Sequence, residues 1–196
     1  MGVPVEVTAP ATEPVTLPEV KAQATIDFAS DDALLLDLIA AARADVEEFL
    51  RRQLITATYD LSLDSFADDG RIIRDGVIHL PLPPLLSVVS ITYTDTAGSS
   101  IVLDSSKYDV DVTALVGRIA PSFGNVWPAT RAEMNAVVIR FSCGYGTADD
   151  LPKNIKQGLL MHIADLYEHR ESQSEILLRE NRAAGSLLWR ARVLEA

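Results

Sequence analysis

The sequence predicts an α+β protein: a helical bundle of N- and C-terminal helices with an inserted antiparallel β domain. Near both ends of the chain, apolar residues recur every three or four positions, which is typical of amphipathic helices. Over residues 55–146 apolar and polar residues alternate instead, which is typical of half-buried strands. With 196 residues, of which 48% are hydrophobic, the chain is long enough to bury a core without cross-links.

The N-terminal part of the chain divides into an arm and two helices. Residues 1–15 are rich in proline, threonine and valine, so we expect a flexible, extended arm that becomes ordered when a neighbour binds it. Residues 16–54 are expected to supply the N-terminal helices of the core. Thr16-Leu17-Pro18-Glu19 matches a capping box and predicts a short helix to about residue 24. A longer helix is expected over 31–52, with an apolar stripe made of Leu35, Leu38, Ile39, Ala42, Val46, Phe49 and Leu50.

Residues 55–146 are predicted to form the inserted antiparallel β region, with roughly six to eight short strands. Asp75-Gly76 marks a turn between two of these strands. Because no connection is long enough to hold a crossover helix, we expect antiparallel pairing of the meander type, in which consecutive strands are neighbours.

Residues 147–172 are predicted to form the C-terminal core helix. Its periodic pattern begins at Leu151-Pro152, and Asp149-Asp150 stands just before it, where carboxylates cap a helix and complement its dipole. The pattern weakens over 173–196, where Gly185 interrupts it. We interpret this C-terminal extension as a docking tail.

Charge limits the possible partners of the protein. The net charge is −11, which argues against wrapping nucleic acid, because phosphate binding needs clustered lysine and arginine. An acidic surface would still allow DNA to pass without sticking to it. Residues 1–169 hold 12 basic and 24 acidic residues, whereas residues 170–196 hold 5 basic and 4 acidic residues. This arginine-bearing end on an acidic body indicates either a docking segment or a solvated helix of mixed charge.

The sequence shows neither a secretory leader nor an apolar run of the roughly 18 residues that a membrane span needs. We therefore expect no membrane association and assembly in the cytoplasm. Cys143 is the single cysteine, so no intrachain disulfide is expected.

Two groups of residues invite an enzymatic interpretation. His162, Asp165 and His169 share one helix, but His162 falls on the apolar stripe and no further ligand is indicated, so a core histidine is the better interpretation. Cys143 lies in an alternating strand and lacks an identifiable partner base, so we expect it to pack as a small hydrophobe. No catalytic, cofactor-binding or metal-binding residue is predicted. The alternative is a metal- or thiol-dependent enzyme that uses His162, His169 or Cys143.

Trp127-Pro128 follows Gly124-Asn125 and indicates a loop anchored by an aromatic side chain. Packing of Trp127 into the core is the interpretation that we favour. The alternative is a monomeric β-rich binding module that recognises a ligand through the loops near Trp127.

The C-terminal extension ends in a group of apolar, aromatic and arginine side chains. Tryptophan and arginine are enriched at interaction hot spots. An apolar chain end packs either on its own domain or on another chain, and we favour another chain. The candidate docking residues are Leu187, Leu188, Trp189, Arg190 and Arg192.

Several segments in the same order resemble the head–tail connector (adaptor) family of tailed bacteriophages and gene transfer agents. The resemblance spans about residues 15–171, and the tail from Ser172 onward matches least well. The matching segments are Val15–Lys21, Asp32–Leu36, Ala40–Glu47, Leu80–Leu85, Trp127-Pro128, Phe141–Gly146, Leu151–Gln157 and Leu166–Glu171.

The resemblance implies a structural ring subunit of the virion neck, assembled in the host cytoplasm, with no enzymatic activity and no cofactor. Such adaptors form a ring, typically dodecameric, below the portal protein. They extend the DNA channel and bind the stopper and tail-completion proteins. The resemblance leaves open whether the particle is a phage or a gene transfer agent. It implies portal docking for the C-terminal extension, so truncation after Gly185 is expected to abolish attachment and to leave the fold intact.

Overall fold

The computed structural model describes residues 2–67, 69–168 and 182–194 and has a mixed α+β fold, which confirms the predicted class. The described residues form two compact units. The first, here called the β unit, lies within Met1–Pro10 and Thr56–Tyr145, and the second, the helical unit, lies within Ala11–Ile55 and Gly146–Leu194.

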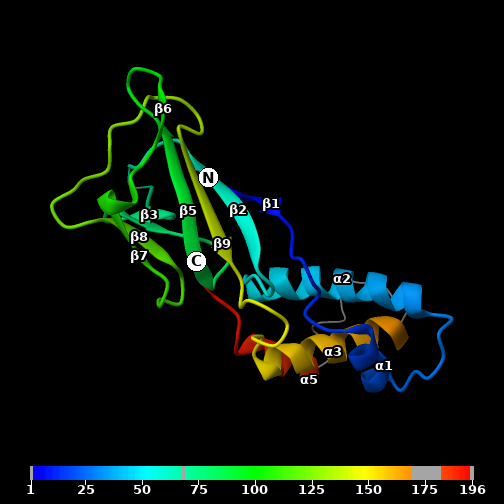
Figure 1. The fold of residues 1–196 in the computed structure, drawn as a ribbon. Coiled ribbons are helices and arrows are strands. Elements are labelled where there is room, and N and C mark those ends of the chain that lie inside the picture. Colours follow the sequence, from blue (N-terminus) through cyan, green and yellow to red (C-terminus); the bar gives the residue numbers. More distant parts are fainter. Residues whose placement is uncertain (1, 68, 169–181, 195–196) are drawn as a thin grey trace. The chain divides into compact units, whose positions relative to one another are not determined.

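The helical unit contains α1 (Leu17–Ala24), α2 (Asp32–Leu50), α3 (Lys153–Glu168) and α5 (Arg182–Trp189) (Figure 1). The periodicity of the sequence predicted which faces of α2 and α3 are buried, because residues three and four apart share one side of a helix. The buried residues are Leu35, Ile39, Ala42, Val46 and Leu50 on α2, and Ile155, Gly158, Leu159, His162 and Ile163 on α3.

The helix ends agree only in part with the expected caps. Glu19 accepts hydrogen bonds from the backbone N–H of Thr16 at 2.8 Å and from its hydroxyl at 2.9 Å, so α1 begins where the capping box predicted. Asp150 was expected to cap α3, but its carboxylate instead accepts bonds from the backbone N–H and the hydroxyl of Thr147, within the preceding turn. In the first turn of α3, the N–H groups of Ile155 and Lys156 donate to the carbonyl of Pro152. Gly185 was expected to interrupt the pattern but lies inside α5.

The β unit contains two antiparallel sheets. The five-stranded sheet has the order β1 (Pro4–Thr8), β2 (Ala57–Leu63), β9 (Val137–Cys143), β5 (Leu85–Thr94) and β6 (Ser100–Val102). The four-stranded sheet has the order β3 (Ile73–Arg74), β4 (Val77–His79), β8 (Arg118–Pro121) and β7 (Tyr108–Asp111), with a short 3₁₀ turn, η1 (Ser105–Lys107), before β7. All the strand pairs are antiparallel, as expected.

The expected meander order is wrong for the five-stranded sheet. The last strand, β9, lies between β2 and β5 (Figure 1) and pairs with both of them. Four side chains of β9 are buried at alternate positions: Val137, Ile139, Phe141 and Cys143. The most apolar strand is therefore central, where neighbours on both sides satisfy its backbone.

The predicted turn at Asp75-Gly76 is confirmed. Both residues have positive φ angles, 52° and 74°, which is the conformation of a two-residue hairpin turn whose twist matches the flanking strands. The turn joins β3 to β4 and sets Ile73 opposite Ile78, and both side chains are buried.

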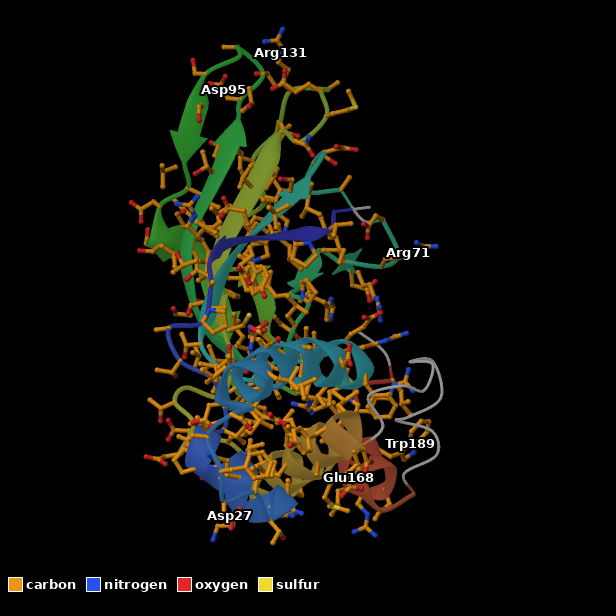
Figure 2. All side chains as sticks on the ribbon, turned by 90° about the vertical axis from the view of Figure 1, so that its right-hand side faces the viewer. Asp27, Arg71, Asp95, Arg131, Glu168 and Trp189 are labelled. Atoms are coloured by element: carbon orange, nitrogen blue, oxygen red, sulfur yellow. The ribbon has the colours of Figure 1, made fainter. Side chains whose placement is uncertain are left out.

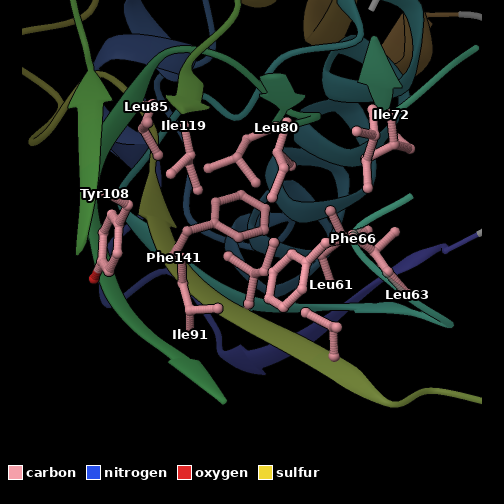
Figure 3. Close-up of a cluster of buried hydrophobic side chains, with 14 of the residues drawn as sticks. Leu61, Leu63, Phe66, Ile72, Leu80, Leu85, Ile91, Tyr108, Ile119 and Phe141 are labelled. Carbon is pink, nitrogen blue, oxygen red and sulfur yellow. The ribbon is translucent and has the colours of Figure 1, made fainter. Parts of the chain in front are cut away.

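The two sheets enclose one apolar core within the β unit (Figure 3). Phe141 from β9 and Leu61 from β2 are fully buried there, together with Ile119 from β8 in the other sheet. The ring of Phe141 stacks on Tyr59 with the centroids 6.1 Å apart. This core fixes the strands whose edges and loops form the surface of the β unit.

Residues 1–15 were expected to form a flexible arm, and part of this segment is a strand. In the structure β1 is extended and pairs antiparallel with β2, with Val5 opposite Asp60. No helix in the described part of the chain has an apolar stretch long enough to cross a membrane.

Candidate functional site

The predicted docking residues belong to α5 and to the segment that follows it. Helix α5 packs on α3, where the side chain of Leu188 lies against Gly158. A Cβ atom added to Gly158 would lie 2.8 Å from Cγ and Cδ2 of Leu188. Glycine at this position therefore allows the two helices to approach closely, and Leu188 is fully buried as a result.

After α5 the chain contacts the end of α2. The guanidinium Nε of Arg52 donates a hydrogen bond to the carbonyl of Ala191 at 2.6 Å. The backbone N–H of Val193 donates to the carbonyl of Leu50 at 3.0 Å, and the side chain of Val193 is buried. These contacts hold residues 190–194 against the helical unit.

Three side chains form a cluster at this junction, here called the terminal cluster: Phe49 of α2, Trp189 of α5, and Arg192. The rings of Phe49 and Trp189 have centroids 6.3 Å apart and are tilted by 52°. The guanidinium carbon of Arg192 lies 5.0 Å from the Phe49 centroid and 5.3 Å from the Trp189 centroid, which is within the range of a cation–π interaction. Trp189 stays 55% exposed at the surface of the helical unit (Figure 2).

Arg192 is only partly satisfied in the terminal cluster. Its Nε atom is buried and has no hydrogen-bond partner among the described residues. A buried donor without a partner is energetically unfavourable. The cluster thus combines an exposed aromatic face with a half-buried cation.

The predicted docking residues are not equally accessible. Trp189 and Arg190 are exposed, and Leu187 and Arg192 are half-buried. Leu188 is a packing residue of the helical unit. Truncation after Gly185 would remove both Leu188 and Val193 from the core, so we no longer expect it to leave the fold intact.

The sequence did not indicate two residues that position the terminal cluster. Phe49 was assigned to the apolar stripe of α2, and Gly158 stood within a helical pattern without an assigned role. A glycine inside a strongly periodic helix is itself a signal of close packing, but the pattern does not identify the residue that packs on it.

Glu47 organises the end of α2, two residues before Phe49. Its carboxylate accepts hydrogen bonds from the backbone N–H of Leu54 at 3.0 Å and from the side-chain amide of Gln53 at 2.9 Å, and it pairs with Arg43 at 3.0 Å. Burial raises the pKa of the Glu47 carboxyl, and the bonds from Leu54 and Arg43 oppose that rise. This buried network fixes the chain where it leaves α2 beside the terminal cluster.

The described residues of the enzymatic alternative, His162 and Cys143, belong to different units. His162 is buried in the helical unit, with its Nε2 atom 3.4 Å from Asp45 Oδ2, which agrees with a core histidine. Cys143 is buried in the β unit, as expected for a packing residue, and His169 lies outside the described residues. Within the described ranges no three histidine, cysteine or acidic residues are grouped as metal ligands require.

Trp127 has a structural role in the β unit. Its ring stacks on Phe66 with the centroids 4.8 Å apart and the planes 3° from parallel. Its indole N–H donates to the carbonyl of Gly76 at 2.7 Å. The packing interpretation of Trp127 is therefore confirmed, and the loop is anchored on the core through it.

Comparison with solved structures identifies the fold. A chain in the neck of an empty gene transfer agent (GTA) particle, computed with C6 symmetry, superimposes with a TM-score of 0.78 at 22% sequence identity, covering 99% of this chain and 97% of that chain. A chain in the virion of the native GTA particle gives the same values. A chain in the neck of the native GTA particle, computed with C12 symmetry, gives a TM-score of 0.71 at 23% identity and the same coverage. At these identities the likeness shows a shared fold.

The sequence itself identifies the family. None of the curated proteins matches the chain. Residues 14–113 match the family described as phage gp6-like head-tail connector protein. The matched region contains α1, α2 and the strands from β2 to β7, and it covers more than half of the chain. The resemblance noted from the sequence is thereby confirmed, and the chain belongs to the phage gp6-like head–tail connector protein family.

Proposed function

We propose that the protein is a structural subunit of a ring in the neck of a phage or gene transfer agent particle. The ring, of twelve copies, lies below the portal protein, extends the DNA channel and joins the head to the stopper or tail-completion protein. The observation that carries this proposal is the match of residues 14–113 to the head–tail connector family.

The fold supports the assignment of the ring. The similar chains come from GTA necks that were computed with C6 and C12 symmetry. A closed ring uses heterologous contacts, in which one surface of each subunit meets a different surface of the next. In this proposal the N- and C-terminal helices form a bundle that is the core of each subunit, and the antiparallel β domain is inserted between them.

The charge of the chain suits a conduit for DNA. Each copy carries a net charge of −11, so a ring multiplies the negative charge around its opening. Such a lining repels phosphate groups and lets DNA pass without being held. DNA passes through the ring without specific binding.

The terminal cluster is the surface that we assign to portal docking. Trp189 offers an exposed aromatic face, Arg190 adds an exposed cation, and the half-buried Arg192 lies over the Trp189 ring. Leu187 lies half-buried beside them, and Leu188 holds α5 in place. An aromatic residue next to arginine is the composition of an interaction hot spot.

This function needs binding surfaces and no reactive group. We infer that the protein has no enzymatic activity and binds no cofactor. It assembles in the host cytoplasm and ends in the virion. Residues 1–15 and 173–196 serve in this proposal as the arm and the docking extension.

Electron microscopy of the purified protein mixed with its candidate portal tests the proposal. We expect a ring of density added below the portal for the wild-type protein. Trp189→Ala combined with Arg190→Glu is expected to abolish attachment, because it removes the exposed aromatic face and reverses the exposed charge of the docking surface. Leu36→Ala, which removes an equally exposed apolar side chain from α2, is the matched control and should attach normally.

Two results would count against the proposal. If no ring is added to portals by the wild-type protein, the connector function at the portal is wrong. If the Trp189 and Arg190 variant attaches as well as the wild type, the ring assignment stands and the docking surface lies elsewhere.

A further inference from the structure

The five-stranded sheet of the β unit has two edges of different character. Strand β1 forms one edge, because it pairs only with β2. At the other edge β6 pairs with Thr92, Tyr93 and Thr94 of β5 and leaves the rest of that strand uncovered. Over residues 85–90, β5 pairs with β9 on one side, and no strand of the described chain pairs with its other side.

Strand β1, together with Val3 just before it, carries a row of exposed valines, here called the valine row. Val3, Val5 and Val7 are all exposed, and Val5 is accessible over 62% of its surface. Valine is a strong strand former whose branched side chain packs well against a neighbouring strand. An edge strand also carries unpaired N–H and C=O groups, which are a template for a further strand.

The open stretch of β5 presents a matching surface. Leu86 and Val89 are exposed there, with Val89 accessible over 58% of its surface. Both stand where the pairing of β5 with β9 shifts register. Residues 80–94 contain no charged side chain. Residues 86–90 are thus uncharged and exposed or half-buried, Leu85 before them is buried, and no described strand pairs with the free side of this stretch.

Charge favours a second copy of this chain as the occupant of these edges. Two copies with a net charge of −11 each repel one another unless they meet through surfaces that carry few carboxylates. Glu6 is the single charged residue among residues 1–12, and residues 80–94 have none. The two open edges are therefore surfaces that copies of an acidic chain can bring together.

Strand direction favours pairing between the two edges. Since β1, β2, β9 and β5 alternate in direction, β1 and β5 run in opposite directions within one copy. A second copy rotated about an axis along the strands keeps its orientation, so its β1 would meet the open stretch of β5 in the antiparallel sense. The contact joins two different surfaces and leaves one edge free on each copy, so it can repeat until a ring closes.

We propose that β1 of each copy adds as an antiparallel strand to residues 85–90 of β5 in the next copy. This inference rests on the proposed ring and specifies the contact that closes it. The valine row of one copy packs beside Leu86 and Val89 of its neighbour, and the backbone groups of both edges become paired.

Cysteine cross-linking of the full chain tests the contact. Val5→Cys and Val89→Cys are prepared as separate variants, mixed at high concentration and treated with a short bismaleimide. We expect a cross-linked dimer in the mixture. When either variant is treated alone, we expect no cross-linked dimer. A double variant should give a ladder up to the closed ring. The wild type is the first control, because its Cys143 is buried and should not react.

A second pair of cysteine variants controls for cross-linking that arises from random collision. Val110→Cys places a thiol at another exposed valine, on β7 of the other sheet, and its mixture with Val5→Cys should give no dimer. Equal cross-linking in that control, or cross-linking of Val5→Cys with itself, would overturn the inference.

Native mass spectrometry of the same samples distinguishes the two proposals. Rings without the Val5–Val89 cross-link would overturn the edge contact and leave the proposed function standing. Single copies at every concentration, with and without the portal, would contradict both. A ladder formed without portal attachment would support the edge contact and count against the portal assignment.

Discussion

The β unit and the helical unit are assembled differently along the chain. Most of the β unit is one continuous segment, Thr56–Tyr145, whose strands share an apolar core between two sheets. The helical unit joins two segments, Ala11–Ile55 and Gly146–Leu194, that are far apart in the sequence. Its last two described helices, α3 and α5, meet through a close contact of Leu188 with Gly158.

The polar contacts of the two units also differ in which parts of the chain they join. In the helical unit they bridge the two segments: Lys156 of α3 pairs with Glu19 of α1 at 2.7 Å, and Tyr167 donates to Asp31 at 2.7 Å. In the β unit the Asp60–Arg140 pair joins neighbouring strands. We infer that the β unit depends most on the volume of its core, and the helical unit on the fit between its helices.

Phe141→Ala is expected to have the largest effect, because it removes the central side chain of the β-unit core. Phe141 is fully buried, so the loss of its ring should lower the free energy of unfolding by about 3–5 kcal/mol. Urea denaturation measures the loss, and hydrogen exchange locates it. Protection should fall in β2, β5 and β9 while α2 and α3 keep theirs. Equal loss of protection in both units would show that they unfold together, and would contradict the difference that we infer between them.

Gly158→Ala tests the close fit in the helical unit. The added Cβ would lie 2.8 Å from the side chain of Leu188, which is fully buried. We expect a loss of about 1–3 kcal/mol from overpacking, against a gain of about 1 kcal/mol from the higher helix propensity of alanine. Thermal unfolding measures the net loss.

Leu188→Ala provides the control for this clash. The double variant Gly158→Ala with Leu188→Ala removes the atoms that the new methyl group would meet. Its stability should therefore exceed the sum of the two single effects, because the substitutions share one contact. Strict additivity would contradict the close approach of α5 to α3.

Local patterns in the sequence predicted helices and strands in both units, because each pattern is formed by residues that are close together along the chain. The period of the stripe from Leu35 to Leu50 predicted α2, and Asp75-Gly76 predicted a hairpin through its backbone preference. The central place of β9 was missed, because alternation shows which side chains are buried and does not show which strands pair. Strand β1 was missed because a short segment with prolines resembles an arm until its partner strand is known.

Only part of the terminal cluster could be predicted from the sequence, for the same reason. Composition singled out Trp189 and Arg192, since both residue types are common at interaction surfaces. The burial of Leu188 depends on Gly158, and the position of Trp189 depends on Phe49. Those partners lie on other helices, so no pattern within the C-terminal extension could indicate them.

Gly76→Ala tests whether the β unit also depends on local backbone geometry. Gly76 has φ of 74°, a conformation that places the Cβ of an L-residue too close to its own backbone. We expect a loss of about 1–2 kcal/mol, less than that of Phe141→Ala. Chemical denaturation measures it. Asp75→Asn is the matched control, because asparagine tolerates a positive φ and should leave stability nearly unchanged. Similar losses for both variants would show that the turn conformation is not the cause.

The smallest effect is expected from Asp111, which joins β7 to β8 through Arg118 at the surface of the β unit. The bond from Arg118 holds the pKa of Asp111 below its usual value, and bonds from Thr113 act in the same direction. A carboxyl whose pKa is lower in the folded state stabilises the fold above its unfolded pKa of about 4, and this contribution is lost as the pH falls toward the folded pKa. Asp111→Asn should therefore unfold at a lower temperature than the wild type at about pH 7, and the gap should narrow at about pH 3. Thermal unfolding of both proteins at the two pH values measures the gap, and a gap of constant width would mean that the ionised form of Asp111 has no special role in the β unit.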